Sequence, residues 1–145
     1  MQSFRSIHDL LVWVQDLHRR CCVRFARARQ ECAEHRYRAL LEFLRDREAE
    51  QFAAIARLIA SGDDRLRCFV QRVPEAALQA AATIEPTGPD FDAEVLRYRQ
   101  RDRALIGAYE QLAANVGHKA GSILRELLSM RARTQARLRE ALIDS

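Results

Sequence analysis

Glycine and proline are scarce in this sequence, which has 5 Gly and 3 Pro among its 145 residues. Because both residue types interrupt helices, this scarcity, together with 48% apolar and 30% charged residues, favours an all-helical globular protein. No apolar run approaches the roughly 20 residues of a membrane span, so we expect no transmembrane helix. A secretory signal is not indicated either, because Asp9 and Asp16 flank the short apolar run near the start. We therefore predict one cytoplasmic domain over residues 1–145.

Patterns that would indicate a zinc, redox or nucleotide site are also missing. The cysteines Cys21, Cys22, Cys32 and Cys68 include no pair with the two-residue gap of a zinc knuckle or a redox dithiol. We expect them to be reduced thiols, with Cys21 facing the core. There is no glycine-rich phosphate loop and no nucleophile constellation. Lysine is almost absent, since Lys119 is the only one, and the net charge is a mild +4.

What the sequence does contain is apolar residues at spacings of three and four, which predict four amphipathic helices. The predicted helices cover residues 6–29, 35–61, 91–116 and 118–143. At 1.5 Å per residue, each is about 37 Å long. Ser6 with Asp9 predicts a capping box, Gly62 a left-handed cap, and Asp90 an N-cap. The break before residue 35 is inferred because the apolar pattern lapses there, and one helix through to Ala60 would be unusually long.

Residues 63–90 do not continue this pattern. Leu66, Phe69 and Val70 predict one short helix, Glu75–Ala82 predicts another, and residues 85–90 form a turn cluster. The segment is too long for a hairpin turn, so we predict a crossover that returns the chain along the bundle. The predicted fold class is therefore all-α, an antiparallel four-helix bundle with one long crossover between its second and third helices.

Polar residues interrupt each apolar stripe close to the middle of its helix. These residues are His18, Glu48, Asp102 and Arg131. In a bundle with aligned ends they meet at one level, where a buried carboxylate must be paired, bound to a metal or protonated. Periodicity does not decide whether Arg131 or its neighbour Met130 faces inward. Thr134 or Gln135 interrupts the last stripe one turn later.

With two helices, a long crossover holding a short helix, and two more helices, the chain resembles the ferritin-like superfamily, in particular small stand-alone bacterial bundles related to rubrerythrin. In that family, a Glu from the first and third helices and a Glu-x-x-His motif on the second and fourth hold two metal ions. The matching positions here are His18, Glu48 with Gln51, Asp102, and Arg131 with Thr134. The resemblance implies a degenerate site, because about four carboxylates and two imidazoles are needed for two divalent metals.

The leading hypothesis for function is a bundle without cofactor that acts through protein binding or self-association rather than catalysis. An inward Arg131 would neutralise Glu48 or Asp102 and so take the place of a metal ion. Trp13 is the candidate interface residue, because the face of the first helix near Trp13 and Phe4 has more apolar surface than a monomer needs.

Two alternatives remain open. The first is a reduced site for iron, manganese or zinc that uses His18, Glu48 and Asp102, with Cys22 one turn from His18 and Met130 facing inward. The second is nucleic-acid binding through clustered arginines. The clusters are Arg19, Arg20, Arg24, Arg27, Arg29, Arg36 and Arg38, and in the last helix Arg125, Arg131, Arg133, Arg137 and Arg139. No reading motif accompanies these arginines, and aromatic residues are few.

Overall fold

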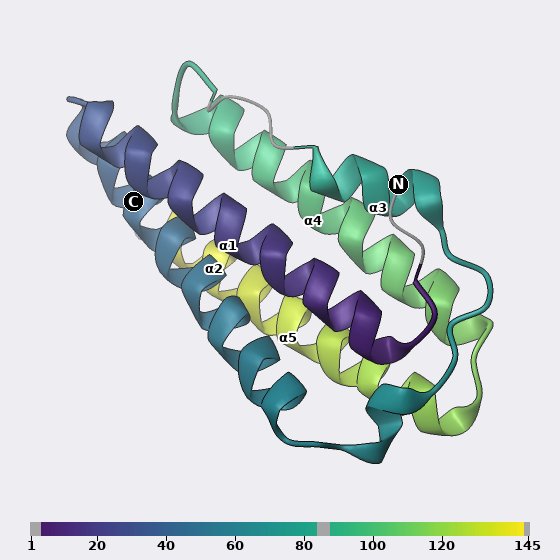
Figure 1. The fold of residues 1–145 in the computed structure, drawn as a ribbon. Coiled ribbons are helices and arrows are strands. Elements are labelled where there is room, and N and C mark those ends of the chain that lie inside the picture. The colour runs from purple at the N-terminus through teal and green to yellow at the C-terminus, as the bar shows by residue number, and fades with distance from the viewer. Residues whose placement is uncertain (1–3, 84–87, 144–145) are drawn as a thin grey trace.

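The computed structural model of the chain describes residues 4–83 and 88–143, and this part is a bundle of helices (Figure 1). Its elements are α1 (Ile7–Glu31), α2 (His35–Ala60), the 3-10 helix η1 (Asp64–Arg67), α3 (Glu75–Ala82), α4 (Phe91–Ala114) and α5 (His118–Ile143). Within the described residues, strand-like pairing is limited to one isolated bridge between Ser6 and Phe69. The predicted all-helical class is confirmed, and the four long helices end within two residues of the predicted bounds.

The cap that starts α2 explains a break that has no glycine or proline. The Glu34 carboxylate accepts hydrogen bonds from the backbone N–H groups of Arg36 and Tyr37 at 2.9 and 2.6 Å. These bonds satisfy amides that have no partner inside the helix. At α1, Ser6 Oγ accepts from the Asp9 N–H at 3.2 Å, as predicted, but the Asp9 carboxylate accepts from Arg5 and not from Ser6.

The connection after α2 differs in part from its prediction. Gly62 has the expected left-handed backbone, with φ of 70°. The first short helix is only η1, and Phe69 and Val70 lie beyond its end. Their segment is extended because it pairs with the start of α1, where Ile7 N–H donates to Cys68 O at 3.0 Å and Val70 N–H to Arg5 O at 3.3 Å. Helix α3 forms as predicted, whereas residues 84–87 of the predicted turn cluster lie outside the described residues.

The connection also links the two ends of the bundle. Near the end of α2, Arg65 donates to Ser122 and Glu126 in the first turns of α5, at 3.0 and 3.1 Å. At the other end, the Tyr37 hydroxyl of α2 donates to Gly88 O, just before α4, at 2.7 Å. Figure 1 shows α3 lying beside α4, α1 beside α2, and α4 beside α5, in agreement with their packing contacts. The chain therefore returns along the bundle before α4 begins.

The predicted apolar stripes make up the core. Fully buried members include Leu10 and Phe25 of α1, Leu44 of α2, Leu112 of α4 and Ile123 of α5. Phe52, Leu58 and Ile59 of α2 and Ile106 of α4, which were also predicted to face inward, are half-buried. The core extends along the whole bundle and encloses the polar layer at its middle.

Gly88 gives a test of how closely the connection approaches α4. A Cβ at this position would lie 2.8 Å from Ala93 Cβ and 3.2 Å from the backbone N of Glu94. We predict that Gly88→Ala lowers the free energy of unfolding by about 1–3 kcal/mol, the usual cost of overpacking. The matched control is Gly107→Ala inside α4, where a Cβ would meet nothing within 4 Å. That change should stabilise the helix by about 0.5–1 kcal/mol. Equal effects of the two changes in urea unfolding would contradict the close approach.

Candidate functional site

The four predicted interruptions of the stripes meet in one buried layer. His18 and Glu48 are each 2% exposed, and Asp102 and Arg131 are each 3% exposed. All four line a single cavity of about 10 Å³ between α1, α2, α4 and α5. A cavity of this size has room for about one water molecule. The layer is thus closed to any substrate larger than water.

Within the layer, each acid has a basic partner on the neighbouring helix. His18 Nδ1 of α1 is hydrogen-bonded to Glu48 Oε2 of α2. Arg131 Nε of α5 donates to Asp102 Oδ1 of α4. Arg131 therefore points inward, and Met130 is half-buried. The pairs satisfy the two carboxylates, because a buried charge is costly unless it is paired and hydrogen-bonded.

Gln51 and Thr134, at the positions where the family motif has histidines, bond to each other. Gln51 Nε2 donates to Thr134 Oγ1 at 3.3 Å, and the Thr134 hydroxyl donates to Met130 O at 3.2 Å. Both residues are buried, at 8% and 4% exposure. A hydrogen bond between buried side chains therefore joins α2 to α5 beside the polar layer.

Several further contacts of the site were not predicted from the sequence patterns. Tyr98 was predicted as a core residue, but its hydroxyl accepts from Arg131 Nη2 at 3.4 Å and hydrogen-bonds the Glu48 carboxylate. Gln135 Nε2 donates to Asp102 Oδ2 at 2.7 Å, so Gln135 as well as Thr134 is engaged. Arg101 Nη1 donates to Cys21 Sγ at 3.5 Å, and both residues line the cavity. Arg101 could have been found from its position next to Asp102 in the sequence. Cys21 could have been found because it lies three residues after His18, on the same face of α1.

The charges in the layer shift the ionisation of its members. Burial would raise the pKa of Glu48, but the charge and hydrogen bond of His18, with smaller effects of Arg131 and Tyr98, lower that pKa to about 2. Burial, reinforced by the Glu48 charge, raises the pKa of Tyr98 and holds it protonated. Burial and the same carboxylate raise the pKa of the Cys21 thiol to about 12. The layer therefore contains a fixed carboxylate and a thiol that does not ionise at neutral pH.

The residues in place do not fit the two-metal site of the family that the sequence resembles. Among the described residues, no group of three or more His, Cys, Asp or Glu side chains is arranged to hold a metal ion. Glu48 and Asp102 are each engaged by a basic partner. Cys22, the candidate fourth ligand of a reduced site, is half-buried and does not line the cavity. Of the candidate metal ligands His18, Glu48 and Asp102, only His18 has a buried atom, Nε2, that lacks a hydrogen-bond partner in the described part of the chain.

The apolar surface expected near Trp13 is smaller than predicted. Phe4 is only 5% exposed, and Trp13 is half-buried with its ring edge-on to that of Phe4 at 5.8 Å between centroids. The prediction that Phe4 lies on an exposed face was wrong, because the pairing of residues 5–7 with the chain after η1 holds the neighbouring Phe4 in the core. Trp13 stays a candidate interface residue with only part of its side chain accessible.

Many of the clustered arginines are engaged within the chain. Four of the seven between residues 19 and 38 form ion pairs, namely Arg19 and Arg20 with Asp16, Arg24 with Glu94, and Arg29 with Glu42. A fifth, Arg36, stacks over the Phe91 ring at 3.8 Å. These contacts reduce the charge that the α1–α2 pair presents to a nucleic acid.

The chain was compared with protein-family models, with curated proteins and with solved structures, and none of the three comparisons gave a match. The site's interpretation therefore depends on its own geometry. No helix within residues 4–83 or 88–143 is long and apolar enough to cross a membrane.

The Asp102–Arg131 pair predicts a strong asymmetry between single and double substitution. Arg131→Met removes the partner of a carboxylate that is 3% exposed, and should cost about 3–5 kcal/mol of unfolding free energy. Combining it with Asp102→Leu removes the stranded charge and should recover most of that loss, since apolar replacement of a buried pair is often neutral. Urea unfolding of the two variants checks this. A single variant as stable as wild type, or a double variant less stable than the single, would contradict it.

The low pKa of Glu48 predicts acid sensitivity with a defined sign. Between the usual value of 4.5 and the folded value of about 2, the unfolded chain takes up a proton at this position and the folded chain does not. Stability from this group is therefore complete above pH 4.5 and is lost as the pH falls toward 2. Glu48→Gln should show a shallower decline of unfolding free energy with acid than wild type. Glu50→Gln, an exposed position on the same helix, should keep the wild-type slope, and identical slopes for both variants would refute the assignment.

Proposed function

We propose that this chain is a ferritin-like, antiparallel four-helix bundle without a metal centre, which acts by binding another molecule rather than by catalysis. The observation that carries the proposal is the Arg131 guanidinium, buried in the polar layer and bonded to Asp102. A cation fixed to the chain stands where the ferritin-like architecture has metal ions. The long connection that runs back along the bundle between α2 and α4 is consistent with the same fold.

The charge balance of the layer supports a metal-free interior. A guanidinium stays protonated in proteins and can pair with a carboxylate in two-pronged geometry, so it replaces part of the charge that a divalent ion would supply. His18 is hydrogen-bonded to Glu48 on the other side of the cavity. A metal ion entering this layer would have to displace both basic partners from the acids and would meet the charge of Arg131.

The interior also offers little for catalysis. The His18–Glu48 pair has the composition of a general acid–base couple, but both side chains are buried beside a cavity of about 10 Å³. The Cys21 thiol, with a pKa raised to about 12, is a poor nucleophile. Function by recognition at the surface, including self-association or binding of a protein partner, is therefore the better-supported class.

One observation favours the second candidate, a reduced metal site. His18 Nε2 is buried without a hydrogen-bond partner in the described residues, and it belongs to a residue that lines the cavity with Glu48 and Asp102. An imidazole nitrogen and two carboxylates are suitable ligands for iron, manganese or zinc. Such a site would need Arg131 to leave the layer, and the same experiment separates the two candidates.

Metal analysis of protein purified without chelators tests the proposal. We predict that the wild-type chain holds no stoichiometric iron, manganese or zinc, because its acids are already neutralised. The variant with Gln51→His, Arg131→Glu and Thr134→His restores two Glu-x-x-His motifs and should bind metal measurably better than wild type. One equivalent of metal in the wild-type protein, lost in Asp102→Asn, would overturn the metal-free proposal in favour of the reduced site.

A further inference from the structure

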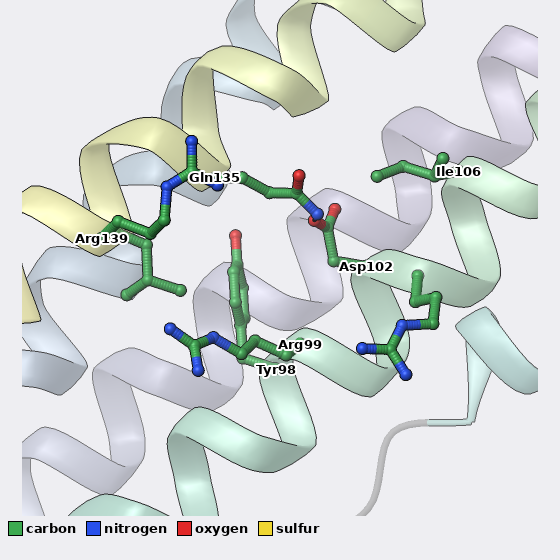
Figure 2. Close-up of a pocket in the computed structure, with 8 residues that line it drawn as sticks. Tyr98, Arg99, Asp102, Ile106, Gln135 and Arg139 are labelled. Carbon is green, nitrogen blue, oxygen red and sulfur yellow. The ribbon is translucent and has the colours of Figure 1, made fainter.

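A second cavity opens on the outside of the bundle, between α4 and α5. This groove has a volume of about 500 Å³ and is lined by Tyr98, Arg99, Asp102, Arg103, Ile106, Gln135, Leu138 and Arg139. Figure 2 shows Tyr98, Arg99 and Asp102 reaching it from α4, and Gln135 and Arg139 from α5. Its volume lies in the range of small-molecule sites, which is about 300–1,000 Å³. The buried residues Tyr98 and Asp102 line both the groove and the layer, so they lie between the two.

The charge of the groove is positive and unbalanced. Its rim arginines, Arg99, Arg103 and Arg139, are exposed and form no ion pair with an acid in residues 4–83 or 88–143. The one acid in the groove is Asp102, and both of its oxygens are already hydrogen-bonded, one by Arg131 and the other by Gln135. The positive charge of Arg131 offsets the negative charge of Asp102. Three guanidinium groups are therefore left to attract an anion.

We propose that this groove binds a small organic phosphate, a monoester whose phosphate contacts the rim arginines and whose apolar body lies against Ile106 and Leu138. The proposal deepens the binding role proposed above and depends on it only for the idea that recognition is the chain's function. Guanidinium forks match the oxygens of phosphate in two-pronged hydrogen bonds. A monoester carries about −1.5 to −2 charge at neutral pH, which suits three arginines better than a single carboxylate does.

The rest of the lining selects an organic body over a bare ion. Ile106 is half-buried and Leu138 is 3% exposed, and both face the groove beside the Tyr98 ring. Apolar contact with such walls adds affinity that inorganic phosphate cannot gain.

Isothermal titration calorimetry of the full chain with phenyl phosphate and with inorganic phosphate tests this site. Phenyl phosphate should bind, and inorganic phosphate should bind more weakly. The variant Arg99→Gln, Arg103→Gln and Arg139→Gln should lose at least about tenfold in affinity for phenyl phosphate, since it removes charge-assisted hydrogen bonds. Ile106→Ala should weaken phenyl phosphate and leave inorganic phosphate unchanged. The matched control replaces three exposed arginines far from the groove, Arg38→Gln, Arg72→Gln and Arg125→Gln, and should bind like wild type.

Three results would overturn the proposal. The first is no heat of binding for phenyl phosphate, and the second is an equal loss in the rim and control variants, which would indicate attraction by overall charge alone. The third is equal affinity for inorganic and phenyl phosphate, which would show that the apolar part of the ligand makes no contact that adds affinity. Metal analysis is independent of all three, so stoichiometric metal together with specific phenyl phosphate binding would refute the metal-free proposal and leave the groove assignment standing.

Discussion

The structure depends on one physical constraint, which is that the guanidinium of Arg131 cannot lose its charge inside the bundle. Burial opposes that charge, while Tyr98, Glu48 and Asp102 around it favour it and raise the pKa of Arg131 above its ordinary range. An acid must therefore stay ionised within bonding distance, and Asp102 fills that place. Because Asp102 lies on α4 and Arg131 on α5, the requirement fixes the rotation and register of these two helices against each other.

A buried carboxylate is hydrogen-bonded to a basic side chain in each of the two helix pairs, α1–α2 and α4–α5. His18 and Glu48 pair within α1–α2, while Asp102 and Arg131 pair within α4–α5, so the carboxylate of each pair is hydrogen-bonded by a basic residue of its own half. Tyr98 joins the halves, since its hydroxyl contacts both Arg131 of α5 and Glu48 of α2. A two-metal centre works differently, because its ions need ligands from all four helices at once. Here each ion pair lies within one half of the bundle, and the Tyr98 hydroxyl connects the two halves.

The sequence carries enough periodicity to predict the four long helices and the apolar core, because each stripe continues over many turns. It also placed His18, Glu48, Asp102 and Arg131 near one level, which needed only their positions along each helix. Pairing needed more, since the choice of Asp102 over Glu48 as the partner of Arg131 depends on how helices rotate about their axes, and spacing alone does not contain that. Tyr98 was missed because an aromatic ring on a stripe packs as core whether or not its hydroxyl is bonded. The extended chain at Phe69 and Val70 followed from pairing with residues near the start, a contact distant in sequence.

Compensation inside the bundle also determines where recognition can occur. Glu48 and Asp102 are each hydrogen-bonded to a basic residue, and the cavity of about 10 Å³ between them has no room for a ligand larger than water. Three arginines without an ion pair in the described residues, Arg99, Arg103 and Arg139, are exposed around the groove between α4 and α5, and the buried Asp102 and Tyr98 line its inner side. A ligand bound there lies against residues that are already held by Arg131 and Gln135, so it meets a fixed wall whose shape does not have to be organised on binding. The contacts that hold the buried ion pair thus also hold the inner wall of the groove in place.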